Sequence, residues 1–401
     1  MESIVIIGGG QAAAFAAQTL RKEGFEGTLS IISDEEKIFY ERPPLSKSVL
    51  AGEESPEILS FFSPEAIDAL NIDWHKPKRA EAIDRDAQTV TLNDGTVLSY
   101  DRLILATGSR PRVPNADWTA FENVHTLRTI DDSLKLQAAF KAGKRLAIIG
   151  GGWIGLEVAA TANKLGLNVD LFELAPRLCG RSAPPEVSEY LYTLHTGKGT
   201  NIHLNCGAID LAENADGTLT LTTECDEVNA DIVLVGAGAE IATELAENAG
   251  LEIKGGIIVD EFGQTSDPNI YAAGDVAIHP VVGFCTQSWA NAQYQAMIAA
   301  KAIMGKNPPA YGEIPWVWSD QYDHNIQIMS LPIDEECTLI IRDSGETQKA
   351  YIHLDSENRV RSIVAINDPK VIGIGRMWFK RKMVLDPEKL ADTSIDVMTL
   401  R

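Results

Sequence analysis

Two copies of one strand-turn-helix pattern constrain the fold of this chain more than any other feature. The first reads "SIVIIGGGQAAAFAAQTL" and the second, about 140 residues later, reads "RLAIIGGGWIGLEVAATANKL". In such a turn one glycine permits the tight bend, and a second lets the backbone approach a pyrophosphate. A third small residue lets the helix pack closely on the strand. Phosphate then meets the helix N-terminus, so each copy predicts a dinucleotide-binding unit.

Each copy is followed by a second apolar strand that ends in acidic residues. Asp34 lies 21 residues after Ala13, and Glu173 lies 18 residues after Gly155. This is close to the spacing of about 20 at which a carboxylate binds a ribose hydroxyl. Glu173 would also repel a 2′-phosphate, which favours NADH over NADPH. Arg181, a positively charged residue eight positions later, means that binding of NADPH is not excluded.

Two further stretches are typical of a chain that passes a bound dinucleotide. "DRLILATGSRPR" is an apolar strand that ends in small residues, and "TSDPNIYAAGDVA" ends a strand at Gly274 and Asp275, whose carboxylate suits a ribityl hydroxyl. Alone, either is an ordinary strand-to-turn junction. Together, in this order around the second glycine-rich turn, they predict a flavoenzyme with two dinucleotide sites.

Composition narrows the class of protein. A chain of 401 residues has room for two to three domains. Its net charge of −22 argues against nucleic-acid partners and anionic membranes. The N-terminus lacks the basic region of a signal peptide, and no apolar run approaches the roughly 18 residues of a membrane span. Five scattered cysteines suit structural thiols in the cytoplasm, and the scattered histidines predict no metal site.

The motifs "GGGQAA", "YERPPLSK", "ATGSRPR", "GGGWIGLEVAA", "SDPNIYAAGDVA" and "WVWSDQY" give a definite resemblance. From Ile4 to about Leu385 the chain resembles the FAD-dependent NADH:ferredoxin reductases of aromatic-ring dioxygenase and bacterial P450 systems. The 3-phenylpropionate/cinnamate dioxygenase ferredoxin reductases also share "APPEVSEYL". The resemblance implies an α/β, glutathione-reductase-like fold with two Rossmann-type dinucleotide-binding domains and a C-terminal α+β domain. The implied segments are 1–112 and 238–315 for FAD, 113–237 for NAD, and 316–401 for the C-terminal domain.

The stretch "YERPPLSK" identifies the chemistry. Disulfide reductases of this fold carry a redox cysteine near this position, but here the chain has Lys47. Electrons must then leave the flavin directly, and a one-electron carrier is the natural acceptor. By resemblance, Lys47 lies beside flavin N5, where a cationic donor favours the negative charge that develops on reduction. Glu157 would pair with it, and these two are the candidate catalytic residues.

Other roles are carried over by resemblance. Trp318 would face the ferredoxin side of the flavin, although a core aromatic is the alternative. The FAD candidates are Gly8, Gly10, Gln11, Ala12, Ala13, Asp34, Arg42, Lys47, Ala80, Ala106, Thr107, Gly108, Arg128, Gly274, Asp275, Ser288, Trp289 and Trp318. The NAD candidates are Gly150, Gly152, Trp153, Ile154, Gly155, Glu157, Glu173, Arg181, Ala237 and Gly238.

Three functions remain open at this point. The first is an NADH:ferredoxin reductase that serves a terminal oxygenase of aromatic hydrocarbon catabolism. Its partner would be a [2Fe-2S] ferredoxin, with a Rieske type favoured and a four-cysteine type possible. The second is a rubredoxin reductase, and the third is an NADH-binding signalling flavoprotein similar to apoptosis-inducing factor. A basic segment at residues 359–389, with eight basic and three acidic side chains, is a candidate docking surface or an ordinary solvated helix face.

Overall fold

The computed structural model describes residues 1–333, 336–345 and 347–400, and the chain divides into two compact units. The first unit comprises Met1–Glu41, Leu59–Arg110 and Glu240–Val317. The second comprises Arg42–Ile58, Pro111–Ala239 and the chain from Trp318 onward. The chain passes between the units along β8 (Ser109–Pro111) and β17 (Ala239–Ile241).

A five-stranded parallel sheet forms the centre of the first unit, in the order β18-β7-β1-β2-β3. Its three inner strands, β1, β2 and β7, are short runs rich in isoleucine and leucine, as expected where both faces of a sheet are covered. Their bounds are β1 Ser3–Ile7, β2 Thr28–Ile32, β3 Ile72–His75, β7 Arg102–Leu105 and β18 Ile270–Ala272.

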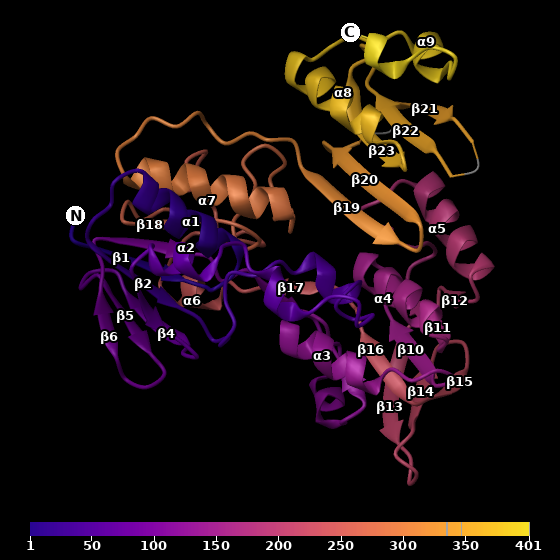
Figure 1. The fold of residues 1–401 in the computed structure, drawn as a ribbon, viewed down its shortest axis with the longest axis horizontal. Coiled ribbons are helices and arrows are strands. Elements are labelled where there is room, and N and C mark those ends of the chain that lie inside the picture. The colour runs from indigo at the N-terminus through magenta and orange to yellow at the C-terminus, as the bar shows by residue number, and fades with distance from the viewer. Residues whose placement is uncertain (334–335, 346, 401) are drawn as a thin grey trace. The chain divides into compact units, whose positions relative to one another are not determined.

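Two alanine-rich helices, α1 (Gln11–Lys22) and α7 (Trp289–Ile303), lie side by side over one face of this sheet (Figure 1). Small side chains line the contact, including Ala13 and Ala296, so the helices approach closely. The other face packs against an antiparallel sheet of β4 (Ala80–Asp84), β5 (Thr89–Leu92) and β6 (Val97–Ser99). The short helices α2 (Pro64–Asp68) and α6 (Glu244–Asn248) complete the unit.

The second unit contains a parallel sheet of the same kind, in the order β12-β11-β10-β16-β9. In both sheets the strand before the glycine-rich turn is central, with the next strand in the chain beside it. The bounds are β9 Val124–His125, β10 Arg145–Ile149, β11 Asn168–Glu173, β12 Asn201–Leu204 and β16 Ile232–Val235, with helices α3 Ile130–Ala139, α4 Trp153–Lys164 and α5 Pro185–Gly197.

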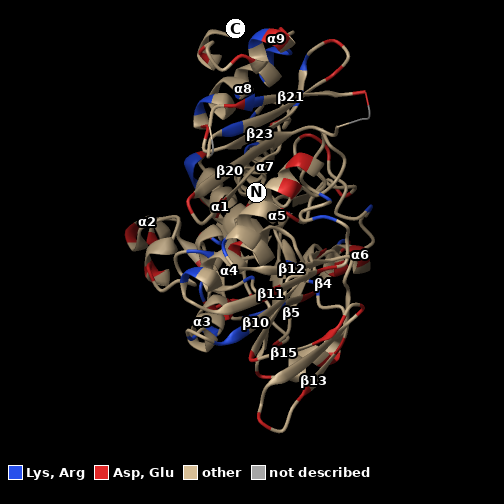
Figure 2. Ribbon diagram, turned by 90° about the vertical axis from the view of Figure 1, so that its right-hand side faces the viewer, with Lys and Arg blue, Asp and Glu red and all other residues tan. Residues whose placement is uncertain are grey.

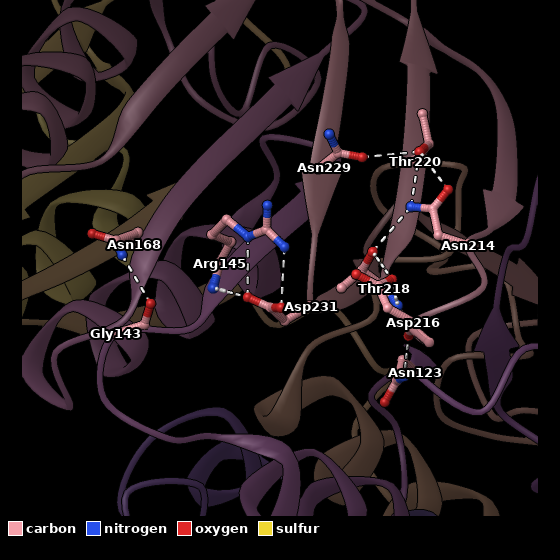
Figure 3. A network of polar contacts seen from close by, with 11 residues as sticks. Asn123, Gly143, Arg145, Asn168, Asn214, Asp216, Thr218, Thr220, Asn229 and Asp231 are labelled. Carbon is pink, nitrogen blue, oxygen red and sulfur yellow. Dashed lines mark hydrogen bonds and ion pairs between the residues drawn. The ribbon is translucent and has the colours of Figure 1, made fainter.

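A small antiparallel sheet packs against the parallel sheet of the second unit. Its strands are β13 (Ala208–Glu213), β14 (Leu219–Thr223) and β15 (Glu227–Ala230), and their leucines share a core with Ile149 and Val233. Figure 3 shows the polar contacts nearby, where Asp231, between β15 and β16, accepts from the backbone N–H and the guanidinium of Arg145. That guanidinium, by hydrogen bonding, lowers the pKa of the Asp231 carboxyl.

The chain ends in a five-stranded antiparallel sheet of order β19-β20-β23-β22-β21. Helix α8 (Pro369–Arg381) covers it, and Gly375 allows close approach, because an added Cβ would lie 2.3 Å from Ile363 Cδ1. The other bounds are β19 Trp316–Gln321, β20 His324–Ser330, β21 Thr338–Asp343, β22 Lys349–Leu354, β23 Val360–Ile366 and α9 Pro387–Ala391. The predicted class of two Rossmann-type sheets with a C-terminal α+β part is confirmed.

The prediction that the five cysteines are independent thiols is wrong for two of them. Cys206 and Cys225 form a disulfide with their Cα atoms 5.6 Å apart. The β13–β14 hairpin folds the second cysteine back onto the first, and a separation of 19 residues gives no sign of this. In the described part of the chain, no helix combines the length and apolar character needed to cross a membrane.

Candidate active site

The glycine-rich turn of the first unit forms a tight junction of three strands. Gly8 has a φ of +127°, and an added Cβ would lie 2.2 Å from the carbonyl oxygen of Ala106 at the end of β7. Gly274, with a φ of +84°, brings the chain after β18 against Ala12, where an added Cβ would lie 3.1 Å from the alanine Cβ. These small residues bring three backbone segments together at the start of α1, as a pyrophosphate cradle requires.

The second unit repeats this construction. Gly150 has a φ of +111°, and an added Cβ would lie 2.4 Å from the Gly236 carbonyl oxygen. A Cβ on Gly155 would lie 2.2 Å from the Gly150 carbonyl oxygen, so only glycine lets α4 approach its strand this closely. The first unit has Ala13 at the corresponding place, where it is fully buried.

The N-termini of α1 and α4 differ from those of other helices in the structure. Their N-caps, Gly10 and Gly152, supply no side-chain hydrogen bond, and neither first turn has an acidic residue. By contrast, Thr129 caps α3 and Asp368 caps α8 with side-chain oxygens. Within the described residues, the N-caps of α1 and α4 therefore provide no side-chain acceptor for the first N–H groups of these helices, which fits the binding of phosphate at both.

Most NAD candidates gather around the start of α4. Glu173, at the end of β11, accepts from the Gly151 N–H at 2.6 Å and from the Ala175 N–H at 2.7 Å, so backbone amides hold both carboxylate oxygens. Across the turn, Arg181 Nη2 would lie 3.0 Å from a Cβ added to Gly238. The Trp153 indole donates to Ser182 Oγ, Ile154 is exposed on the same turn, and Ala237 lies partly buried before Gly238.

The acidic residue of the first unit is displaced by one position. Register places Ile32 opposite Ile7 and Phe172 opposite Ile149, so the residue equivalent to Glu173 is Ser33. Asp34 comes one residue later and is exposed. A spacing rule of about 20 residues is too coarse to separate neighbouring positions, and the ribose role of Asp34 stays a prediction.

Most of the remaining FAD candidates of the first unit lie at strand ends and helix starts, and one, Ala80, lies in the core. Gln11 Nε2 donates to the Trp289 carbonyl oxygen at 2.9 Å, which joins the start of α1 to the start of α7. Thr107 donates to the Ala242 carbonyl oxygen, Gly108 has a positive φ, Ser109 Oγ donates to Asp275, and Ser288 is the N-cap of α7. Ala80, at the start of β4, instead packs in the core beneath the sheet.

Gln295 is a candidate that sequence reasoning missed. Its side chain is 1% exposed, and its Oε1 accepts from the Gly274 N–H at 2.9 Å. Its Nε2 is buried with no hydrogen-bond partner among the described residues. A buried amide is costly to leave unpaired, so an acceptor beside Gly274 fits this site. No motif marks a glutamine in the second turn of a helix.

An ion pair in the second unit holds the two candidate catalytic residues together. Lys47 Nζ lies 2.9 Å from Glu157 Oε2, with the side chains 19% and 4% exposed. Lys47 directly follows the 3-10 turn Pro43–Ser46, and its ammonium also donates to the Pro43 carbonyl oxygen at 3.0 Å. Glu157 lies on the second turn of α4, where Thr161 of the same helix donates to the Ser46 carbonyl oxygen.

Two serines complete the surroundings of the Glu157 carboxylate. Ser46 Oγ donates to Oε2, and Ser319 Oγ on β19 donates to Oε1 at 2.6 Å. At 2.9 Å and an effective dielectric of about 20, the ion pair attracts by roughly 6 kcal/mol, a gain comparable to the several kcal/mol that burying each ion costs. The pair therefore fixes position rather than adding much stability. Sequence reasoning missed both serines.

The other FAD candidates outside the first unit are Arg42, Arg128 and Trp318. Arg42 Nη1 donates to the Arg128 carbonyl oxygen at 2.6 Å, and the Arg128 N–H donates to Asp132 at the start of α3. Trp318 is half-buried on β19, one residue before Ser319. Their contacts with a flavin remain a prediction.

The cysteines nearest the candidate site are not placed or activated for thiol chemistry. Residues 1–178 contain no cysteine. Burial raises the pKa of the Cys179 thiol, which lies 3.7 Å from the Gly151 carbonyl oxygen, and burial raises the pKa of Cys285 to about 11. Protonated thiols are poor nucleophiles. Among the described residues, no group of three or more histidine, cysteine or acidic side chains is placed to hold a metal ion.

Comparison with known proteins places the chain in a family. Residues 2–296 match the family described as pyridine nucleotide-disulphide oxidoreductase, and residues 316–401 match the reductase C-terminal family. The chain is 36% identical to the anthranilate 1,2-dioxygenase system ferredoxin–NAD(+) reductase component of Burkholderia cepacia, with 99% of each chain covered. It is 38% identical to the 3-phenylpropionate/cinnamic acid dioxygenase ferredoxin–NAD(+) reductase component of Photorhabdus laumondii, with 97% of this chain and 98% of that protein covered.

A solved structure agrees. Putidaredoxin reductase, in its covalent complex with putidaredoxin, superposes with a TM-score of 0.94 at 35% identity, covering 99% of this chain and 97% of that one. The expected resemblance is thereby confirmed. The chain belongs to the pyridine nucleotide-disulphide oxidoreductases and, within them, to the NAD-dependent ferredoxin reductases, which are FAD flavoproteins.

Proposed function

We propose that this chain is the NADH-oxidising reductase of an oxygenase system and delivers electrons to a small [2Fe-2S] ferredoxin. FAD, when bound, accepts a hydride from a nicotinamide and releases electrons singly. A Rieske-type ferredoxin that serves an aromatic-ring dioxygenase is the favoured partner, since both curated relatives named above are components of dioxygenase systems. We also propose a cytoplasmic location, where NADH is available.

The observation that carries this proposal is the Lys47–Glu157 ion pair. By resemblance, Lys47 stands near the position of the redox cysteine in disulfide reductases of this fold, and no cysteine occurs before Cys179. Without a dithiol to receive an electron pair, a one-electron carrier is the acceptor that matches flavin chemistry.

Each part of the chain has a task in this proposal. Segments 1–112 and 238–315 hold FAD, with its pyrophosphate at the N-terminus of α1. Segment 113–237 holds NADH, with its pyrophosphate at α4 and a ribose against Glu173. With FAD bound, Lys47 would supply a cationic donor to the flavin, and Glu157 keeps that ammonium in place through the 2.9 Å contact. Segment 316–401 supplies Trp318 and the ferredoxin-docking surface.

The experiment compares electron acceptors. The purified FAD-loaded protein is mixed with NADH and, in parallel, with a Rieske ferredoxin, a four-cysteine [2Fe-2S] ferredoxin and a rubredoxin at matched concentrations. We expect the highest kcat/KM with the Rieske ferredoxin. A preference for rubredoxin would overturn the assignment, and flavin reduction far slower than NADH binding would favour the signalling alternative.

Lys47→Met tests the proposed task of the lysine. The variant should still bind FAD, because the remaining contacts of the cradle are untouched. Flavin reduction by NADH should slow by roughly ten- to a thousandfold, the scale for losing one electrostatic donor. Anaerobic stopped-flow absorbance measures this rate, and an unchanged limiting rate would remove Lys47 from the mechanism.

A further inference from the structure

A chain of buried polar side chains continues from Glu157 into the C-terminal sheet. Ser319 and Gln321 lie two residues apart on β19, and His195 lies in the last turn of α5. The three are 2%, 0% and 0% exposed. Their hydrogen bonds connect the Glu157 carboxylate with Tyr322, so α4, α5 and β19 of the second unit share one polar network.

The hydrogen bonds of this polar network all run in one direction, from His195 toward the Glu157 carboxylate. His195 Nε2 and Gln321 Oε1 are 2.8 Å apart, and Gln321 Nε2 donates to Ser319 Oγ at 2.9 Å. Ser319 Oγ then has its own hydrogen for Glu157 Oε1, at 2.6 Å. Since the Gln321 amide is oriented by Ser319, its oxygen must accept, and His195 must carry its proton on Nε2.

The far end of the chain is consistent with this tautomer. Tyr322 Oη accepts from Asn163 Nδ2 at 2.9 Å and also contacts the Thr200 side chain, and it lies 3.4 Å from His195 Nδ1, within reach to donate to the imidazole. Burial lowers the pKa of His195 to about 4, so the ring is neutral at physiological pH. A neutral ring with Nε2–H is the form that the chain needs.

We propose that Ser319 is a positioning residue for the reductase reaction, and that the His195–Gln321 pair orients it. Ser319 holds Oε1 of Glu157 and thereby directs Oε2 toward Lys47. The inference rests on the proposed function of the Lys47–Glu157 pair and extends it to β19. Ser319 also directly follows Trp318, so the same strand positions the carboxylate and carries the aromatic residue that we assign to the ferredoxin side.

The geometry distinguishes this role from ordinary sheet packing. A serine that only stabilises local packing satisfies its hydroxyl on nearby backbone, as Ser188 on α5 does with the Leu178 carbonyl oxygen. Ser319 instead donates to a carboxylate 162 positions away in the chain, at the buried end of an ion pair. Its loss would leave Oε1 without that donor and free the carboxylate to rotate.

The test compares three variants of the FAD-loaded protein by anaerobic stopped-flow reduction with NADH. Ser319→Ala should lower the limiting rate of flavin reduction about tenfold while the apparent Kd for NADH stays within a factor of two. Ser319→Thr keeps the hydroxyl and should restore at least half of the rate. Ser362→Ala is the matched control, because Ser362 is 1% exposed on β23 of the same sheet and takes no part in this hydrogen-bond network.

A second variant and a second readout cover the case in which Ser319→Ala fails to fold. Gln321→Met removes the amide at similar volume and should slow flavin reduction about threefold. Independently of activity, ¹⁵N NMR of the histidine side chains should show His195 as the Nε2–H tautomer in the native protein, with loss of that tautomer preference in Gln321→Met. A native Nδ1–H tautomer would contradict the proposed direction of the hydrogen bonds from His195 to Glu157.

The outcomes also separate this inference from the proposed function. If Lys47→Met slows flavin reduction but Ser319→Ala and Gln321→Met match Ser362→Ala, the positioning role fails and the function of the ion pair stands. If Lys47→Met leaves the limiting rate unchanged, both fail. Equal losses in Ser319→Ala and Ser319→Thr would show that the hydroxyl itself is not what matters, and would also reject the proposal.

Discussion

Glu173 illustrates how a single residue can serve both the turn and the cofactor. Its oxygens are held by the N–H groups of Gly151 and Ala175, so the carboxylate is fixed where the second glycine-rich turn begins. A ribose hydroxyl can still donate to its remaining lone pairs. A 2′-phosphate at the same place would meet a fixed negative charge.

Glu173→Gln should therefore raise the kcat/KM ratio of NADPH to NADH by about tenfold, close to 1.4 kcal/mol of discrimination. Glutamine keeps one acceptor for the backbone and removes the charge. The matched control is Glu224→Gln, because Glu224 also accepts a backbone N–H, that of Gly207, outside the turn. An unchanged cofactor ratio in Glu173→Gln would reject the ribose role.

At the scale of elements, the contact between α5 and β19 depends on a neutral His195. Burial lowers its pKa to about 4 in the folded protein, compared with about 6.5 in an unfolded chain. Between these values the unfolded chain binds more protons, so this contribution to stability is complete above pH 6.5 and is lost as pH falls toward 4. The full loss is about 3 kcal/mol.

His195→Asn should flatten that part of the stability curve. Urea unfolding from pH 7 to pH 4 should show a slope smaller than wild type by up to about 1.4 kcal/mol per pH unit, equivalent to one proton. The variant removes one titrating group, and part of the slope remains because burial also lowers the pKa of His125, His279 and His353. His203→Asn on β12 is the control, and identical slopes for wild type and His195→Asn would contradict the buried-neutral assignment.

The elements also show which parts of the candidate site can be predicted from the amino-acid sequence. The two glycine-rich turns were predictable because their chemistry is local, within six residues of one strand end. Ser319, Gln321 and His195 were not, because packing of α5 against β19 brings them together over more than 120 positions. Serine, glutamine and histidine also carry no spacing rule of their own. Ser33 and the Cys206–Cys225 disulfide were missed because strand register and hairpin folding place them.

For the whole molecule, the proposed function raises the question of how a protein with a net charge of −22 would dock a ferredoxin that is itself acidic. The basic segment at residues 359–389 runs against the overall charge, and Figure 2 shows basic positions in blue along α8. Lys370, Lys380 and Arg381 of this helix are exposed. At about 0.15 M salt the Debye length is roughly 8 Å, so a partner senses mainly the surface that it faces. Local charge should therefore decide docking.

The two sources of charge predict opposite responses to salt. If the overall charge governs, raising ionic strength screens repulsion and speeds ferredoxin reduction; if the basic segment governs, it weakens attraction and slows the reaction. We expect slowing in wild type, and a lower, flatter response in the triple variant Lys370→Glu, Lys380→Glu, Arg381→Glu. A control with the same change in net charge, Lys22→Glu, Lys254→Glu, Lys306→Glu, changes exposed lysines of the first unit and should keep the wild-type slope. Stopped-flow reduction of the flavin by NADH should be equal in all three proteins, because neither triple touches the glycine-rich turns or the Lys47–Glu157 pair. Equal loss of ferredoxin turnover in both triples would assign the effect to overall charge and place the docking surface away from α8.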